Sequence, residues 1–224
     1  MKTHDKISQN NITPEIALKF LKEGNARFVD NLRINRNLLQ QVNDTSDGQW
    51  PFAAIVSCMD SRTSAELIFD QGLGDIFSIR LAGAVITDNV LGSLEYACKV
   101  ANSKFIVVLG HTKCGAIKGA CDAVEMGNLT ALLNKITPSV HGEKTVKENR
   151  TSHNPAFLDA VTHIHTERSV QAIMEQSNIL REMIQKGEVG IIGAVYDVET
   201  GLVNFLDHTL LTGNTTPHYE MVAV

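Results

Sequence analysis

The sequence predicts an α/β fold, with a mostly parallel central sheet of four to five strands, flanking helices and an N-terminal helical arm. Continuous apolar runs, typical of strands buried on both faces, occur at 52–58, 76–80, 105–109 and 191–196. Helical patterns separate the first three runs, and strands that alternate with helices form parallel sheets through crossover connections. Because no internal repeat or linker interrupts the chain, we expect a single domain over 1–224.

The N-terminal arm (1–35) is built around one amphipathic helix, predicted over 14–31. Thr13 supplies an N-cap, a proline occupies the first helical position, and apolar residues follow at helical spacing. The segment 32–49 is rich in Asn, Gln and Asp and is predicted as a loop. It leads into the α/β core, which we expect over 50–206.

The other elements of the core lie between and after the buried strands. Helical patterns occur near 64–70, near 88–101 and directly after Cys114. The segment 128–154 is polar and is predicted as an irregular surface excursion. A long helical region follows it, with a break near 177–178, and the run 202–206 is expected to add an antiparallel edge strand.

Composition excludes several classes of function. The chain has 20 basic and 25 acidic residues, so its net charge of −5 offers no basic surface for nucleic acid or anionic lipid. The apolar stretches fall short of the roughly 18 residues of a membrane span. The first residues are polar and form no signal core, so we expect a cytoplasmic protein, or a periplasmic one if a leader has been removed.

Potential metal ligands follow the carboxyl ends of two predicted strands. Cys58 ends the first buried run, and His111 and Cys114 follow the third. Because ligands collect beyond the carboxyl ends of the strands in an open α/β sheet, we expect these side chains to meet. Two thiolates and one imidazole suit Zn²⁺, and three protein ligands leave a fourth position open for catalysis. On spacing alone, packing of free cysteines in the core is an equal alternative.

The two remaining cysteines are expected to pack in the core. Cys98 lies in an apolar helical segment, and Cys121 follows Cys114 by two helical turns. Four cysteines in a chain of 224 residues do not form a disulfide framework. The prediction therefore divides the cysteines into two ligands and two packing residues.

An acidic and a basic residue follow Cys58 closely. Asp60 and Arg62 are close enough in sequence to form a bidentate, charge-assisted pair that fixes the carboxylate. Taken alone, the simpler interpretation is a solvated ion pair on a loop, which contributes little to stability. Beside a metal ligand, the pair becomes a candidate for catalysis. By contrast, His163 and Glu167 share a helix face and are interpreted as a surface pair.

The combination C-x-D-x-R and H-x-x-C-G resembles the β-class carbonic anhydrases. The resemblance covers about 49–119, and more loosely 196–201. It implies one Zn²⁺ per subunit, with the ligands Cys58, His111 and Cys114. It also implies that Asp60 and Arg62 form the catalytic dyad.

The resemblance further implies a substrate pocket of the plant-like, open-site subclass. Gln49 matches a glutamine that donates to the substrate. Phe77 and Tyr96 match aromatic pocket residues that come from the neighbouring subunit of a dimer, although without the resemblance they would be interpreted as core. Ala82 takes the place of a small aliphatic pocket residue, and Gly115 follows the last zinc ligand.

Several positions distinguish this chain from the family pattern. Ile55 stands where the bicarbonate-inhibited subclass carries a tryptophan, which favours the open-site subclass. Met59 replaces a usual serine, Thr63 and Ser64 replace a common Val-Pro, and Ala84 stands where asparagine is frequent. None of these differences removes a ligand or a member of the dyad.

The expected function is the reversible hydration of CO₂ to bicarbonate and a proton by attack of zinc-bound hydroxide. Two alternatives stay open: hydrolysis of a related heterocumulene such as CS₂ or COS on the same fold, and a non-catalytic zinc-binding homologue. The resemblance implies self-association as a dimer or tetramer. The expected partners are the small substrate and further copies of the chain, with no nucleic acid and no membrane.

Overall fold

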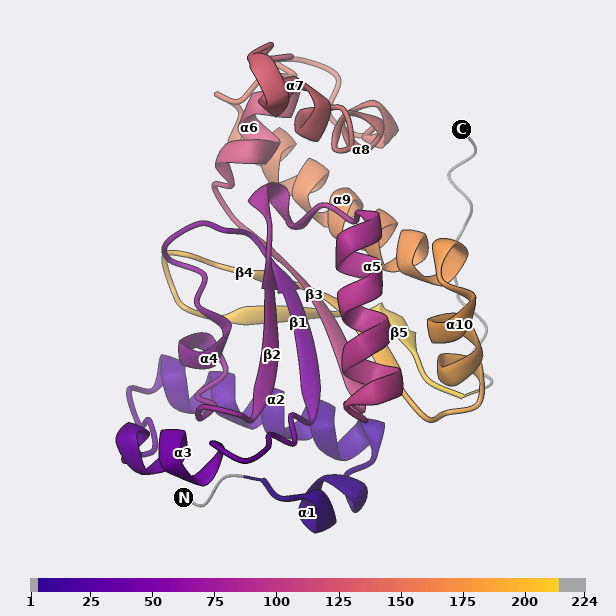
Figure 1. Ribbon diagram of the computed structural model, residues 1–224. Helices are drawn as coiled ribbons and strands as arrows, with labels where there is room; N and C mark the ends of the chain where they lie inside the picture. Colours follow the sequence, from indigo (N-terminus) through magenta and orange to yellow (C-terminus); the bar gives the residue numbers. More distant parts are fainter. Residues whose placement is uncertain (1–3, 214–224) are drawn as a thin grey trace.

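A five-stranded sheet with helices on both faces forms the centre of the protein in a computed structural model that describes residues 4–213 (Figure 1). The strand order is β2-β1-β3-β4-β5, in which β5 is antiparallel to β4 and all other pairs are parallel. This arrangement confirms the predicted fold class. The strands are β1 (Ala53–Ser57), β2 (Ile76–Arg80), β3 (Phe105–His111), β4 (Gly190–Tyr196) and β5 (Val203–Leu211).

The helices largely follow the predicted pattern. They are α1 (Lys6–Asn10), α2 (Pro14–Val29), α3 (Leu38–Asp44), α4 (Ala65–Ile68), η1 (Ala82–Ala84), α5 (Asp88–Glu95), the π-helical η2 (Tyr96–Val100), α6 (Gly115–Cys121), α7 (Gly127–Leu133), α8 (Thr137–Gly142), α9 (Pro155–Gln176) and α10 (Asn178–Gln185). The predicted break at 177–178 is confirmed, because Ser177 has an extended backbone and caps α10 through the Leu180 N–H. Over residues 4–213, none of these helices is both long enough and apolar enough to span a bilayer.

Two predicted irregular segments contain short helices, so those predictions were wrong in detail. In 32–49, the Asn37 side chain caps α3 by accepting from the Gln40 N–H. In 128–154, α7 and α8 form, and the buried residues Leu133 and Ile136 anchor them against the core. Their apolar residues are too few to produce a helical period, so tertiary contacts and local caps decided these helices.

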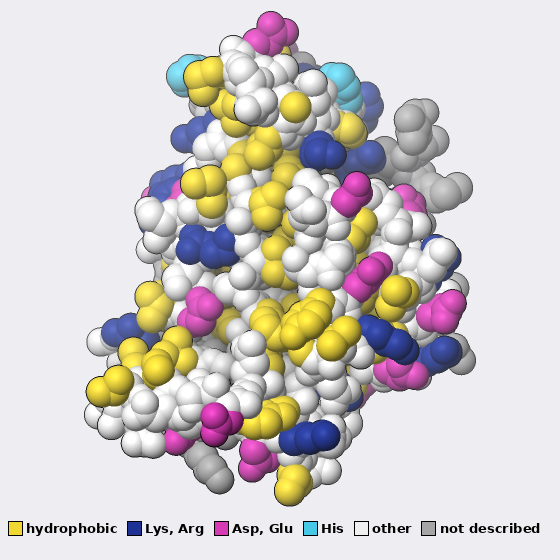
Figure 2. Space-filling model, in the orientation of Figure 1, with side chains coloured by type: hydrophobic (Ala, Val, Ile, Leu, Met, Phe, Trp, Pro, Cys, Tyr) yellow, Lys and Arg dark blue, Asp and Glu magenta, His cyan; other side chains and the backbone are white. Residues whose placement is uncertain are grey.

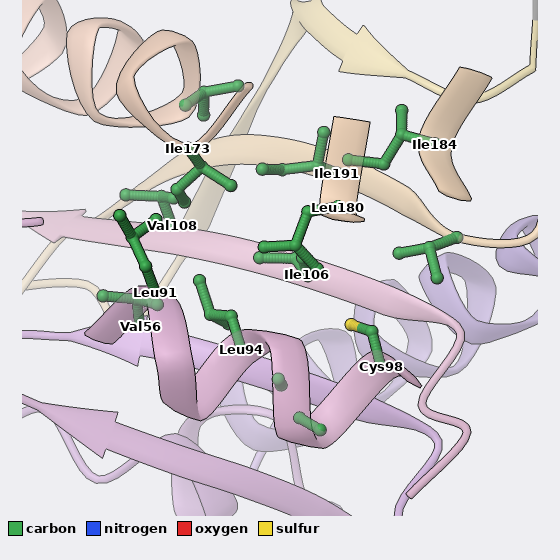
Figure 3. Close-up of a cluster of buried hydrophobic side chains, with 14 of the residues drawn as sticks. Val56, Leu91, Leu94, Cys98, Ile106, Val108, Ile173, Leu180, Ile184 and Ile191 are labelled. Carbon is green, nitrogen blue, oxygen red and sulfur yellow. The ribbon is translucent and has the colours of Figure 1, made fainter. Parts of the chain in front are cut away.

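Each central strand packs on both faces, as the continuous apolar runs predicted. Ala54 and Val56 of β1 face α5, α9 and α10, whereas Ala53 and Ile55 face α2 and α4. Cys98 points into the cluster of buried side chains between the sheet and α5, α9 and α10 (Figure 3), where burial raises the pKa of its thiol to about 12. Its predicted role in packing is confirmed.

A buried carboxylate connects the N-terminal arm to the core. Asp70 follows α4, its side chain is 2% exposed, and it accepts hydrogen bonds from the side chains of Arg27 and Arg36. Burial opposes the ionisation of Asp70, but the hydrogen bonds from these two guanidinium groups outweigh it and lower the pKa of the carboxyl. The pair of cations therefore keeps Asp70 charged within the protein.

Replacing Asp70 by asparagine is expected to lower the free energy of unfolding by about 3 kcal/mol, because it leaves two partly buried guanidinium groups without their carboxylate. Urea titration followed by circular dichroism measures this change. The matched control is Asp207→Asn, since the Asp207 side chain is 76% exposed and forms a surface ion pair with Lys22. Equal midpoints for the two variants would contradict a stabilising role for Asp70.

Candidate metal centre and active site

Two cysteines and a histidine meet at the carboxyl edge of the sheet. Cys58 follows β1, His111 ends β3, and Cys114 precedes α6. Because β1 and β3 are adjacent and parallel, their carboxyl ends lie side by side beneath α6–α8 (Figure 1). The potential ligand atoms all lie within 4.8 Å of one another, with the two sulfur atoms 4.0 Å apart. All three side chains are buried, and the two cysteines belong to an apolar cluster that includes residues of α6, α7 and α9.

The orientation and tautomer of the His111 imidazole suit the binding of a cation. Its Nδ1 lies 2.9 Å from the backbone oxygen of Thr112. A carbonyl oxygen only accepts, so Nδ1 carries the proton and Nε2 presents a lone pair. That Nε2 is buried and has no hydrogen-bond partner among the described residues. A buried acceptor without a donor is costly, so the donor set fits a metal ion placed between Nε2 and the two sulfur atoms.

The surroundings of Cys58 favour its thiolate form. The hydrogen bond from the Cys114 thiol contributes most to lowering the pKa of Cys58. Backbone N–H groups of Asp60 and Gly83 also donate to Cys58 Sγ, each at 3.4 Å. The same hydrogen bond, together with burial, raises the pKa of Cys114. Cys58 is therefore the more acidic of the two thiols, and a bound cation would favour loss of the second proton.

The carboxylate of Asp60 is held beside this group by a guanidinium. Arg62 Nε and Nη2 donate to Asp60 Oδ1 and Oδ2 at 2.9 and 2.8 Å, and the Arg62 backbone N–H donates to Oδ1 at 3.0 Å. The hydrogen bonds from Arg62 hold the pKa of Asp60 well below its usual range. Asp60 Oδ2 lies 4.0 Å from His111 Nε2. The structure thus brings the predicted dyad to the predicted ligand set.

Two residues that the sequence did not assign to the site fix the loop after β1. Arg80 Nε donates to the backbone oxygen of Cys58 at 3.1 Å, and Arg80 Nη2 donates to that of Asp60 at 2.6 Å. The hydroxyl of Thr63 lies 2.9 Å from both of these oxygens. Arg80 pairs in register with Ser57, the residue before Cys58. Its position at the end of a predicted strand could therefore have indicated that it lies near the site. Thr63 was noted only as a difference from the family pattern.

A third unassigned residue, His165, supports the site from α9. Its Nε2 lies 2.9 Å from the backbone oxygen of Gly83, the residue whose N–H donates to Cys58 Sγ. Burial lowers the pKa of His165 to about 4, so the imidazole is neutral and its Nε2 carries the donated proton. Gly83 has φ +67°, and a Cβ there would lie 2.7 Å from Ile136. The sole sequence signal for His165 was its helical spacing from buried Val161.

The predicted surface pair of His163 and Glu167 is wrong. Glu167 pairs instead with His208 of β5, at 3.0 Å. The Nδ1 of His163 lies 2.8 Å from the backbone oxygen of Asp159, one turn earlier on α9. Helical spacing alone did not reveal the competing partner on the neighbouring strand.

The predicted pocket residues are more dispersed than the dyad and the ligands. Phe77 and Tyr96 form an edge-to-face pair, with ring centroids 6.3 Å apart, in a cleft of about 520 Å³ between β2 and α5. This cleft is not lined by the Cys-His-Cys group. Gln49 is exposed and makes no side-chain hydrogen bond to the described residues. Ala82 begins η1 beside the loop that carries Gly83, and exposed Gly115 begins α6.

The fold and the site together define an α/β protein with a Cys-His-Cys group that could hold a metal ion at the carboxyl edge of its sheet. The family model described as carbonic anhydrase matches residues 53–203. Carbonic anhydrase 2 of Mycobacterium tuberculosis is 38% identical over 206 residues, which cover 88% of this chain and 95% of that protein. The carbonic anhydrase of Mycolicibacterium smegmatis is 34% identical over 88% of this chain and 96% of its own length. The chain belongs to the carbonic anhydrase family and is a β-class enzyme.

Solved structures share the same fold. The β-carbonic anhydrase of Coccomyxa, solved in complex with acetazolamide, superposes with a TM-score of 0.68 at 23% identity, over 82% of this chain and 83% of that one. The β-carbonic anhydrase CafA of Aspergillus fumigatus superposes with a TM-score of 0.66 at 23% identity, over 86% and 90%. At this level of identity, the likeness concerns the fold.

Proposed function

We propose that Cys58, His111 and Cys114 bind one zinc ion per subunit and that the enzyme hydrates CO₂ reversibly to bicarbonate and a proton. The observation that carries the proposal is the unpartnered, buried Nε2 of His111 beside two thiol groups. Two sulfur ligands and one imidazole suit Zn²⁺ and leave a fourth position open. When bound, zinc lowers the pKa of a coordinated water from about 15.7 to about 7, which supplies hydroxide near neutral pH.

In this proposal, Asp60 orients the attacking water. Its Oδ2 lies 4.0 Å from His111 Nε2. It is therefore placed to accept a hydrogen bond from that water, which directs a lone pair of the water oxygen at the carbon of CO₂. Arg62 keeps the carboxylate ionised and fixed by two parallel hydrogen bonds. Arg80 holds the backbone on either side of Met59, which preserves the distance between Cys58 and Asp60.

We further propose that two or more copies of this single-domain subunit complete the substrate pocket. CO₂ carries no charge and therefore needs a small apolar pocket, with Gln49 donating to one of its oxygens. Phe77, Ala82, Tyr96 and Gly115 are assigned to this pocket. Apolar side chains gather over the lower part of α5 and η2 (Figure 2), where Tyr96 is 55% exposed. Two β-carbonic anhydrases of Sordaria macrospora with the same fold are described as tetrameric.

Stopped-flow CO₂ hydration, with zinc measured by elemental analysis on the same sample, tests the proposed function. We expect hydration activity with about one zinc per subunit. Parallel assays with CS₂ and COS test the alternative substrates. Faster turnover of either gas would replace the proposed substrate, and full zinc content without turnover of any gas would identify a non-catalytic zinc-binding homologue.

A further inference from the structure

A second cavity, of about 250 Å³, lies between the start of α5, α8 and α9. Two cationic side chains on its wall, Lys135 and Arg168, are exposed, and neither forms an ion pair or a side-chain hydrogen bond with any residue in 4–213. Figure 2 shows Lys and Arg side chains gathered on the surface between α8 and the start of α5. Because no described carboxylate pairs with Lys135 or Arg168, this side of the cavity offers positive charge to a ligand.

The floor of the same cavity is polar and buried. Ser139, His165 and Ser169 are 1%, 7% and 4% exposed. Ser139 Oγ lies 3.3 Å from His165 Nδ1 and is therefore satisfied. Ser169 differs, because its hydroxyl makes no hydrogen bond with the residues that the structure describes. Ser169 lines the cavity, so its hydroxyl is free to donate a hydrogen bond to a ligand oxygen there.

We propose that this cavity binds a small oxyanion of the phosphate type, either free phosphate or a phosphomonoester. Arg168, Lys135 and Ser169 provide two cationic donors and one hydroxyl donor, which match the several acceptor oxygens of a tetrahedral anion. Asp88 is the single carboxylate of the wall, so the two cations outnumber it. The volume of about 250 Å³ leaves room for a small organic group attached to the phosphoryl.

His165 and Gly83 connect the cavity to the candidate metal centre through two hydrogen bonds. His165, on its floor, pairs with the Gly83 oxygen at 2.9 Å, and the Gly83 N–H donates to Cys58 Sγ at 3.4 Å. An oxyanion seated on Arg168 and Ser169 therefore lies beside the residue that supports a metal ligand, without entering the site of hydration. The inference goes beyond the proposed hydration reaction and does not depend on it.

Isothermal titration of the zinc-loaded 224-residue chain with inorganic phosphate tests this proposal. We expect saturable binding at one site per subunit. Arg168→Gln and Lys135→Gln should each weaken binding about tenfold, because each removes a charge-assisted hydrogen bond. Asp88→Asn should instead strengthen binding, because it removes the opposing charge. The matched control is Lys99→Gln, which removes one positive charge from an exposed position outside the cavity and should leave binding unchanged.

The opposite directions expected for Asp88→Asn and Arg168→Gln separate a binding site from general damage to the fold. The absence of saturable phosphate binding would overturn the proposal. Binding that is equal in Arg168→Gln and Lys99→Gln would also overturn it, since phosphate bound only at the metal centre is insensitive to both substitutions. A second titration with glycerol 3-phosphate distinguishes the ligands: tighter binding than phosphate identifies an ester, and weaker binding identifies the free anion. A protein without hydration activity still permits every one of these measurements.

Discussion

Cys114→Ser is expected to abolish stoichiometric zinc binding, which is the largest effect that we predict. The substitution leaves one thiol and one imidazole, and a hydroxyl does not replace a thiolate as a ligand for Zn²⁺. Cys58 and His111 then remain as two ligands, and the Cys-His-Cys group contains no fourth His, Cys, Asp or Glu among the described residues. Elemental analysis after gel filtration measures the zinc content, and CO₂ hydration should fall with it.

The matched control for the zinc experiment is Cys121→Ser. Cys121 lies at the end of α6, is partly buried and does not belong to the Cys-His-Cys group. It packs against the apolar cluster around the site, so its replacement is expected to change stability slightly and zinc content not at all. Equal zinc in the Cys114 variant and the control would reject Cys114 as a ligand. Circular dichroism of both variants shows whether zinc loss follows from unfolding.

Asp60→Asn is expected to retain zinc and to lower kcat for CO₂ hydration by about 10²- to 10⁴-fold, the range associated with a positioned acid or base. An amide has the size of the carboxylate but replaces one of its two acceptor oxygens with an NH₂ donor. It therefore cannot accept hydrogen bonds from Arg62 and from the attacking water as the carboxylate does. It also loses the ionic part of the pair with Arg62. Stopped-flow hydration, normalised to zinc content, measures the effect.

Two further variants define the role of Asp60. Asp207→Asn removes an exposed carboxylate of β5 and should leave kcat unchanged. Arg62→Lys keeps the positive charge but loses the bidentate geometry, so its kcat should fall between those of the wild type and Asp60→Asn. Hydration by Asp60→Asn at the wild-type rate, with zinc retained, would remove Asp60 from the proposed mechanism.

Most of the fold could be predicted because each central strand is marked in the sequence by a continuous apolar run. The apolar runs that contain Ile55, Val107 and Ile192 are buried on both faces, and such runs are typical of covered parallel sheets. The short helices α3 and α8 had no such pattern. They depend on the cap from Asn37 and on the burial of Ile136, and neither produces a period in the sequence.

The candidate site was predictable where the order of the strands determined it. Cys58 and His111 belong to neighbouring parallel strands, whose carboxyl ends meet, and Cys114 is three residues from His111. Asp60 and Arg62 are adjacent to Cys58, so local chain geometry brings them to the same place. Gln49, Phe77 and Tyr96 were assigned by resemblance alone, and a single chain does not bring them to the metal ligands.

By itself, the sequence determined the central strands and predicted the Cys-His-Cys set and the adjacent dyad, because hydrophobic periodicity and motif spacing are properties of the chain. Only the tertiary structure decided that His111 presents Nε2 and that His165 supports Cys58 through Gly83. The imidazole of His165 and the oxygen that it contacts are 82 positions apart, a separation over which no local pattern extends. Likewise, Arg168 and Lys135 share a cavity only because α9 packs beside the start of α8.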